Sequence, residues 1–423
     1  MDIIKFYCKN HKKSISFPVR IELFIVFSAL VLIISPMITG INFKDNDDVG
    51  KTELFLSPRC EELFGKEATE ALLRGFGERN PDLLVRQVNV TDEKINAPDI
   101  FIFDEGDFNA LVASDSLISL KFYSHTESGD EQLAIPLVSF MNLLFYNIEL
   151  LKAAGFDRPP KTKEEFLVYS QVISGGNNNS LAGVSGAAIS LGSGDNMAVS
   201  RDIYSWLWAG GGDFWQKDNG GPVINNKVML NGITFLGRLY RENALAPHSF
   251  ETTGTQRLEE FAAGKIAMMI ASTRDIPALR EKMGNTFGIT AIPGSGSAGS
   301  YNIGLSGYYA GISSACEHPD EAWNFLVFIA EQSHLLCAGL QAVPGAVLDL
   351  ILSDYIKSDP VYYKAWEIFA HPGTGIVRGF SGKHNGKEYD NIVREEFSIF
   401  FGNGRTATET ADAIQRRWLE IKE

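Results

Sequence analysis

The side chains best suited to chemistry in this sequence are carboxylates and aromatic rings next to predicted strand ends. Phe103, Asp104 and Glu105 complete or directly follow the predicted strand Asp99–Phe103. Ligands in open α/β sheets bind beyond the carboxyl ends of the strands. Carboxylates accept hydrogen bonds from hydroxyl groups, and an aromatic ring stacks on an apolar ligand face. This triplet predicts a binding site, and a solvated turn is the alternative.

Two further aromatic residues are candidates because glycines flank them. Trp208 stands just before Gly210–Gly212, and we expect its ring to lie off the core-facing side of a short helix. Tyr308 follows Gly307 in a predicted loop that leads into a strand at Ala310. Glycine gives such turns conformational freedom, and an aromatic ring beside one suits the wall of a binding site. Core packing is the alternative for both rings.

Two weaker candidates are expected in exposed loops. Asp195 lies in the predicted loop Gly192–Asn196, and Tyr389 follows the basic, glycine-rich stretch Arg378–Lys387. Loops often carry binding residues, which keeps both residues under consideration. An exposed loop without a ligand is the alternative.

The sequence lacks the motifs typical of a hydrolase or a metal site. It contains no G-x-S-x-G motif, and its seven histidines show no spacing such as H-E-x-x-H. A glycosidase pair among the 52 acidic residues is the remaining enzymatic alternative. We therefore predict a binding protein that is not an enzyme and uses no metal or cofactor.

Length and charge narrow the possible partners. The chain has 423 residues, enough for two domains, and a formal net charge of −14. Its N-terminal stretch is basic, so the rest is more acidic still. Such a body is repelled by phosphate backbones, and we expect no nucleic-acid partner.

The N-terminus predicts a membrane segment. Lys12, Lys13 and Arg20 precede the uncharged, almost wholly apolar run Leu23–Ile41, which is long enough to span a bilayer or to act as a signal sequence. The positive-inside rule places the basic stretch in the cytoplasm and the body outside. We assign residues 1–43 to a cytoplasmic basic stretch and a hydrophobic signal or anchor helix, and favour a retained anchor.

The body alternates short β-rich runs with amphipathic helices. The first such unit comprises a strand at Thr52–Leu56, a helix at Lys66–Glu78 and a strand at Leu83–Val90. This alternation is typical of βαβ units and a mostly parallel sheet. Thr162 with Glu165, and Thr406 with Glu409, have the spacing of helix capping boxes.

Four segments together resemble family 1 of the bacterial extracellular solute-binding proteins, which contains the maltose-binding proteins. They are LFYNIELLKAAGFDRPPKTKEEF (Leu144–Phe166), FAAGKIAMMIAS (Phe261–Ser272), GITAIPG (Gly288–Gly294) and GISSACEHPDEAWNFLVFIA (Gly311–Ala330). The resemblance implies a two-lobed periplasmic-binding-protein fold of the α/β class, with a ligand cleft between the lobes. It places residues 50–137 and 293–332 in the first lobe, and 138–292 and 333–423 in the second.

The same resemblance implies a function. It indicates the receptor subunit of an ABC importer that closes on a sugar-like ligand and delivers it to permease subunits. A two-lobed surface receptor or scaffold without a transport role is the alternative.

The sequence also departs from the family at two places. Arg274 stands where the family often has an aromatic residue. In the cleft it would suit an acidic or highly hydroxylated ligand, whereas in a helix cap or surface pair it would say nothing about the ligand. The stretch between Gln87 and Pro98 is short, which predicts a reduced first lobe.

Overall fold

The computed structural model describes most of the body of the chain. The described residues are 50–88, 98–121, 132–176, 179–192, 195, 198–215, 221–294, 301–336, 340–341, 359–377, 379–380, 385–402 and 404–421. The predicted membrane segment 1–43 lies outside them, as does most of the stretch between Gln87 and Pro98. Both of those expectations stay predictions.

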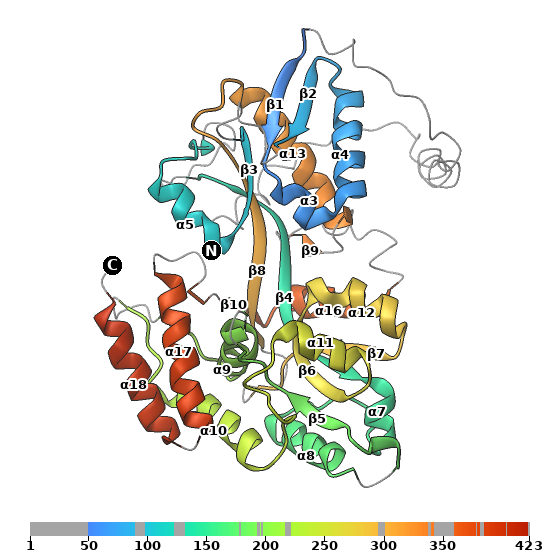
Figure 1. Cartoon of the computed structure of the whole chain (residues 1–423), viewed down its shortest axis with the longest axis vertical. Helices are drawn as coiled ribbons and strands as arrows, with labels where there is room; N and C mark the ends of the chain where they lie inside the picture. The colour runs from blue at the N-terminus through green and yellow to red at the C-terminus, as the bar shows by residue number, and fades with distance from the viewer. Residues whose placement is uncertain are drawn as a thin grey trace.

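Two long antiparallel strands form the axis of the molecule. β4 (Ile135–Asn147) and β8 (Tyr301–Ile312) pair over Ile135–Met141 and Leu305–Ala310, and both extend beyond this shared region. In Figure 1 they run vertically between an upper and a lower group of elements. The two groups therefore share one hydrogen-bonded sheet, whose main strand order is β2-β1-β3-β8-β4-β6-β5.

The upper group, here called the first lobe, contains the N-terminal βαβ unit. β1 (Thr52–Leu56) pairs in parallel with β2 (Leu83–Gln87) and with β3 (Ile100–Asp104), and β3 pairs antiparallel with β8. The first strand and the first long helix were predicted correctly. The helices of this lobe are α3 (Arg59–Phe64), α4 (Lys66–Arg79), α5 (Glu105–Ala113) and α13 (Pro319–Leu336).

The lower group, the second lobe, surrounds the other end of β4. There β4 pairs antiparallel with β6 (Ile266–Ser272) and β7 (Phe287–Thr290), and β6 pairs in parallel with β5 (Ser185–Ala188). β10 (Thr374–Val377) joins β8. The helices are α7 (Ile148–Ala153), α8 (Lys163–Ser174), α9 (Ser205–Ala209), α10 (Lys227–Arg241), α11 (Gly254–Ala262), α12 (Ile276–Met283), α16 (Pro360–Ala370), α17 (Gly386–Phe401) and α18 (Ala407–Glu420).

Each lobe has hydrophobic packing of its own. One cluster of buried side chains fills the first lobe, and two clusters fill the second. The change of lobe along β4 is abrupt, because Phe140 belongs to the first lobe's cluster and Met141 to one of the second lobe's. Along β8 the change falls between Ile303 and Tyr308.

Local signals in the sequence were mostly confirmed, with two corrections. Thr406 and Glu409 form the predicted capping box at the start of α18. Thr162 caps α8, but the Glu165 carboxylate accepts a hydrogen bond from the backbone of Lys161, so this box is only half formed. Tyr308 was expected in a loop, whereas it lies within β8 and pairs with the backbone of β3.

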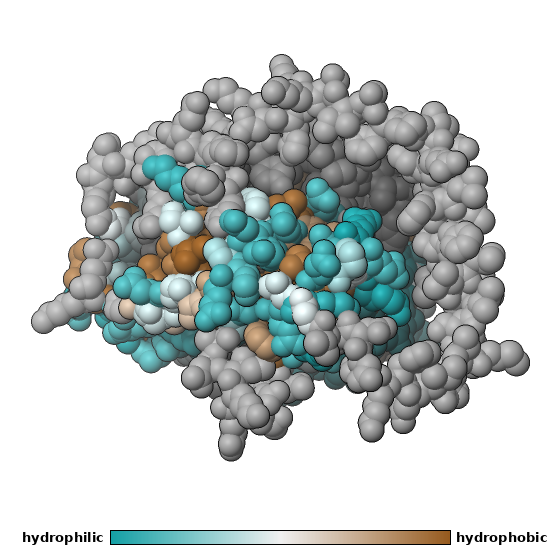
Figure 2. Space-filling view, turned by 90° about the horizontal axis from the view of Figure 1, so that it is seen from above, coloured by the Kyte–Doolittle hydropathy of each residue, from teal (hydrophilic) through white to brown (hydrophobic). Residues whose placement is uncertain are grey.

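Seen from the β1–β2 end, the described surface is mainly hydrophilic, with hydrophobic side chains in smaller areas (Figure 2). Among the helices built from described residues, none is both long enough and apolar enough to cross a bilayer.

The packing of β8 against α9 predicts that a larger residue at Gly304 destabilises the fold. A Cβ atom added at Gly304 would lie 2.5 Å from Cζ3 of the buried Trp208 ring. The ring has little room to move in a packed core, so Gly304→Ala should destabilise the fold by about 1–3 kcal/mol. Denaturant unfolding of the full-length protein, followed by tryptophan fluorescence, measures this loss.

Gly77→Ala is the matched control. Gly77 lies within α4, and a Cβ atom there meets nothing within 4 Å. Alanine should stabilise the helix by about 0.5–1 kcal/mol because it has the higher helix propensity. Equal effects of the two substitutions would contradict the proposed close approach of β8 to Trp208.

Candidate functional site

The first part of the candidate site lies at the carboxyl ends of two parallel strands of the first lobe. β1 ends at Leu56 and β3 ends at Asp104, and parallel strands direct these ends toward the same edge of the sheet. Arg59, at the start of α3, lies 3.2 Å from Asp104 and 2.6 Å from Asp107, measured between side-chain nitrogen and oxygen atoms. The edge therefore carries one guanidinium group between two carboxylates.

These three side chains are held in place and still reach solvent. Asp104 also accepts a hydrogen bond at 3.2 Å from the backbone N–H of Asp107 in the first turn of α5. Partial burial lowers the pKa of Arg59, but Asp107 and Asp104 outweigh it and raise that pKa above its usual value. The two carboxylates are about two-fifths exposed, at 42% and 43%, so both side chains are accessible from solvent.

The neighbours of Asp104 in the predicted triplet have different positions. Phe103 is almost fully buried, with its ring stacked beside Phe108 and Tyr309 at centroid distances of 6.0 and 6.2 Å. Its position suits packing beneath the strand end better than stacking on a ligand. Glu105 begins α5, and its side chain lies outside what the structure describes.

The second part of the candidate site joins the two lobes. Arg274 follows β6 in a short 3₁₀ turn, Thr273–Asp275, and its side chain donates a hydrogen bond of 3.0 Å to the Tyr308 hydroxyl. Tyr308 is the register partner of Asp104 across the β3–β8 pair. Three of the predicted site residues, Asp104, Tyr308 and Arg274, are thereby brought together in one region.

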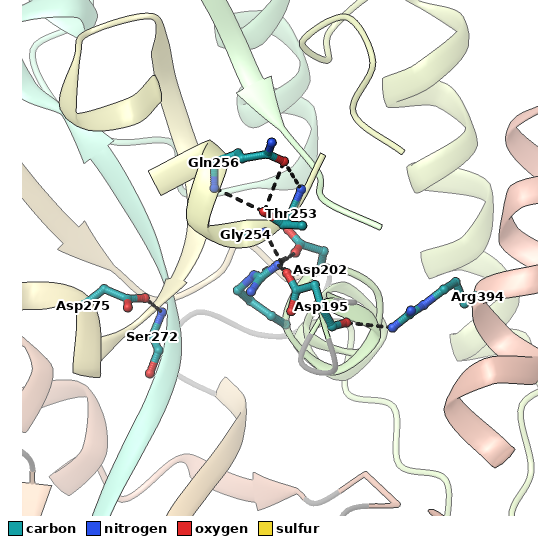
Figure 3. Close-up of polar contacts among 9 residues, drawn as sticks. Asp195, Asp202, Thr253, Gly254, Gln256, Ser272, Asp275 and Arg394 are labelled. Carbon is teal, nitrogen blue, oxygen red and sulfur yellow. Dashed lines mark hydrogen bonds and ion pairs between the residues drawn. The ribbon is translucent and has the colours of Figure 1, made fainter. Parts of the chain in front are cut away.

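Asp195 belongs to a separate polar network within the second lobe. Its carboxylate lies 2.9 Å from Arg201 and accepts a hydrogen bond of 2.7 Å from the backbone N–H of Gly254, while its carbonyl accepts one from Arg394 (Figure 3). Arg201 also pairs with Asp202 at 2.6 Å. The side chain of Asp195 is therefore largely buried and ties three segments together.

Burial dominates the electrostatics of this network. It raises the pKa of Asp202 to about 6, although Arg201 acts in the opposite direction. Burial likewise raises the pKa of Asp275, which accepts a hydrogen bond from the backbone N–H of Ser272 (Figure 3). The network holds the second lobe together, and its carboxylates are less exposed than those of the Arg59 cluster.

Trp208 and Tyr389 lie in the core of the second lobe. Trp208 was expected off the core-facing side of its helix, but its side chain is only 1% exposed and packs near Tyr204 and Phe214. Tyr389 is buried in α17 with its ring stacked on Phe380 at 4.3 Å. Both rings have the environment of structural core residues.

The sequence reasoning missed Arg59 and Asp107. Arg59 stands three residues after the carboxyl end of β1, so the strand-end rule that selected Asp104 applies to it equally. The expectation of no metal stays a prediction. Among the described residues, no group of three or more His, Cys, Asp or Glu side chains could hold a metal ion.

The two lobes, the two strands that run through both, and the polar groups at the strand ends define the class of two-lobed ligand-binding proteins. The family described as bacterial extracellular solute-binding protein matches residues 84–333, which is more than half of the chain. The chain belongs to this family. The predicted resemblance and the two-lobed α/β fold are confirmed.

A curated relative matches the chain at low identity. A probable ABC transporter-binding protein of Deinococcus radiodurans is 23% identical over 254 residues. The match covers 57% of this chain and 58% of that protein, so the chain matches less than two thirds of its relative's length.

Solved structures share the fold over most of both chains. The cyclic α-maltosyl-1,6-maltose binding protein of Arthrobacter globiformis has a TM-score of 0.69 at 16% identity, covering 87% of this chain and 98% of that one. UgpB of Mycobacterium tuberculosis, in complex with glycerophosphocholine, has a TM-score of 0.68 at 18% identity, with coverages of 88% and 98%.

The aromatic core predicts a pH-dependent contribution to stability. Burial raises the pKa of Asp390 to about 6, partly offset by a 2.8 Å hydrogen bond from the Tyr204 hydroxyl. Since the folded form then binds more protons than the unfolded form between about pH 4 and 6, this group's contribution falls as pH rises through that window. The total change is about 3 kcal/mol.

Asp390→Asn should remove this component, because the amide keeps an acceptor for Tyr204 and does not titrate. The difference in unfolding free energy between variant and wild type, measured from pH 4 to 7, gives its size. Asp412→Asn, at an exposed position of α18, is the control. A flat difference curve for Asp390→Asn would contradict the assigned burial of this carboxyl group.

Proposed function

We propose that this protein is an extracytoplasmic receptor of an ABC importer that binds a sugar or sugar-like ligand between its lobes. The observation that supports it most is the placement of Asp104 at the carboxyl end of β3 and of Asp107 in the first turn of α5, next to the strands that connect the lobes. Several solved structures of this fold bind sugars, such as the maltosyl-maltose binding protein.

The binding mode follows from the separate cores. We propose a first lobe of residues 50–137 and 293–332 and a second of 138–292 and 333–423, with the ligand cleft between them. The change of hydrophobic cluster between Phe140 and Met141 supports a boundary in β4, three residues after residue 137. In β8 the cluster changes between Ile303 and Tyr308, which favours a second boundary inside that strand, after residue 293. A ligand that contacts both lobes stabilises the closed arrangement by its differential affinity for it.

The ligand contacts come from both lobes in this proposal. Asp104, Asp107 and Glu105 would accept hydrogen bonds from ligand hydroxyl groups. The second lobe would contribute Arg274, which donates a hydrogen bond to Tyr308, the register partner of Asp104. Asp195, Trp208, Tyr389 and Phe103 would support the site from within the lobes. The protein would act without enzymatic turnover, metal or cofactor, and permease subunits would receive the ligand.

Binding without turnover tests the function. Calorimetry of the full-length protein in detergent against neutral mono- and oligosaccharides and polyols should find at least one stoichiometric ligand, recovered unchanged after incubation. Asp104→Asn should weaken its affinity roughly tenfold, because a hydrogen bond to a charged acceptor is lost.

Glu53→Gln is the matched control for that substitution. Glu53 is 44% exposed and pairs with Arg86 in the same lobe, so it resembles Asp104 in exposure and partner but lies away from the strand ends. Its affinity should equal that of the wild type. Release of reducing sugar, abolished by replacing one carboxylate, would assign the protein to the hydrolases.

We also propose that residues 1–43 tether the body to the outer face of the cytoplasmic membrane. The basic residues ahead of the apolar run Leu23–Ile41 support this orientation. Protease added to intact spheroplasts should digest the body, and the body should sediment with membranes. Full protection of the chain in spheroplasts that remain sealed would place the body inside and reject the tether.

A further inference from the structure

The junction between the lobes is a short stretch of β4 and β8. β4 contributes Phe140 to the first lobe's hydrophobic cluster and Met141 to the second lobe's, and β8 makes the same change between Ile303 and Tyr308. The two strands stay paired across it, with Phe140 opposite Ser306 and Met141 opposite Leu305. Any rotation of one lobe against the other must bend the strands here.

The turn that carries Arg274 is anchored beside this junction. The Thr273 hydroxyl accepts a 3.0 Å hydrogen bond from the backbone N–H of Met141. Ser272 and Asp275 form a capping box that fixes the turn, and Ala271 and Ile276 on either side belong to the second lobe's cluster. The backbone of Arg274 therefore moves with the second lobe.

The side chain of Arg274 reaches the first lobe. Its guanidinium carbon lies 5.4 Å from the ring centroid of Tyr308 and 6.0 Å from that of Phe140, in addition to the 3.0 Å hydrogen bond to the Tyr308 hydroxyl. Both rings are buried in the first lobe's cluster, with Tyr308 8% and Phe140 3% exposed. The contact combines a cation–π interaction with a hydrogen bond from a charged donor.

The partners of Arg274 distinguish this contact from an ordinary surface ion pair. The neighbouring carboxylate of Asp275 accepts a hydrogen bond from the backbone of Ser272 in the capping box. The Arg274 guanidinium contacts a neutral hydroxyl and two aromatic rings of the other lobe. The geometry of all three depends on the angle between the lobes.

We propose that Arg274 is a positioning residue for lobe closure: its contact with Tyr308 and Phe140 stabilises one interlobe arrangement and so sets how much binding energy the ligand must supply to change it. The proposal deepens the proposed function, on which it rests, and gives Arg274 a role that does not require contact with the ligand. Ligand affinity then changes with Arg274 through the population of the competent arrangement.

The test measures the lobes without ligand. Fluorophores introduced through non-canonical amino acids at the exposed positions Glu70, in α4, and Glu281, in α12, report the interlobe distance in the full-length protein by single-molecule energy transfer. Arg274→Gln and Tyr308→Phe should each shift the ratio of interlobe arrangements about two- to fivefold. The double variant should shift it no more than the larger single change, because both substitutions affect one contact.

Matched controls separate this effect from general loss of charge or hydroxyl. Arg238→Gln removes an arginine whose partner Glu242 lies in the same lobe, and Tyr363→Phe removes an exposed hydroxyl on α16. Both should leave the distance distribution unchanged. If Arg274→Gln fails to fold, as judged by circular dichroism, Tyr308→Phe decides the matter.

Two results would overturn the proposal. One is a distribution of interlobe distances, without ligand, that is the same in Arg274→Gln, Tyr308→Phe and the wild type. If ligand affinity falls in the variants while these distances stay the same, Arg274 is a direct ligand contact. The other is fully independent effects of the two substitutions. A failure to find any sugar ligand would reject the proposed ligand class. The interlobe distances measured without ligand would still test the role of Arg274.

Discussion

The pairing of β4 with β8 is the constraint on which the rest of this structure depends. It shifts register once, between Pro136 and Val138, and is regular from Val138 to Met141, across the point where the hydrophobic side chains change from one cluster to another. Backbone hydrogen bonds fix the register of β4 against β8. Because each lobe has its own hydrophobic core, one lobe can move against the other without repacking of either core. A protein built this way can close on a ligand at a small cost in its own stability.

Arginines organise the polar groups of each lobe in a similar way. Arg59 lies between Asp104 and Asp107 in the first lobe, and Arg201 lies between Asp195 and Asp202 in the second. A planar guanidinium group fixes two carboxylates at once. The difference is burial, since the first cluster is open to solvent and the second is nearly closed. That difference makes the first a candidate for ligand contact and the second a support for the fold.

Much of the local structure was predictable because the signals are local. The alternation of Leu54 and Leu56 in β1, and the Thr406–Glu409 box before α18, depend on residues a few positions apart. The family segments gave the two-lobed fold, since a fold is shared by relatives even at low identity. Trp208 was misplaced because the pattern of a helix only five residues long does not show which neighbours cover its other sides.

The sequence by itself determined the elements, the fold class, the acidic body and the carboxylates at the end of β3. Only the tertiary structure decided which of these side chains meet. Arg59 and Asp104 are 45 residues apart, and Arg274 and Tyr308 are 34 apart, so no local periodicity relates them. Their contacts follow from strand order and from the parallel or antiparallel sense of the strands. Those features are set by the packing of the whole chain, because hydrophobic burial is non-directional and the pairing of distant strands is not specified by either strand alone.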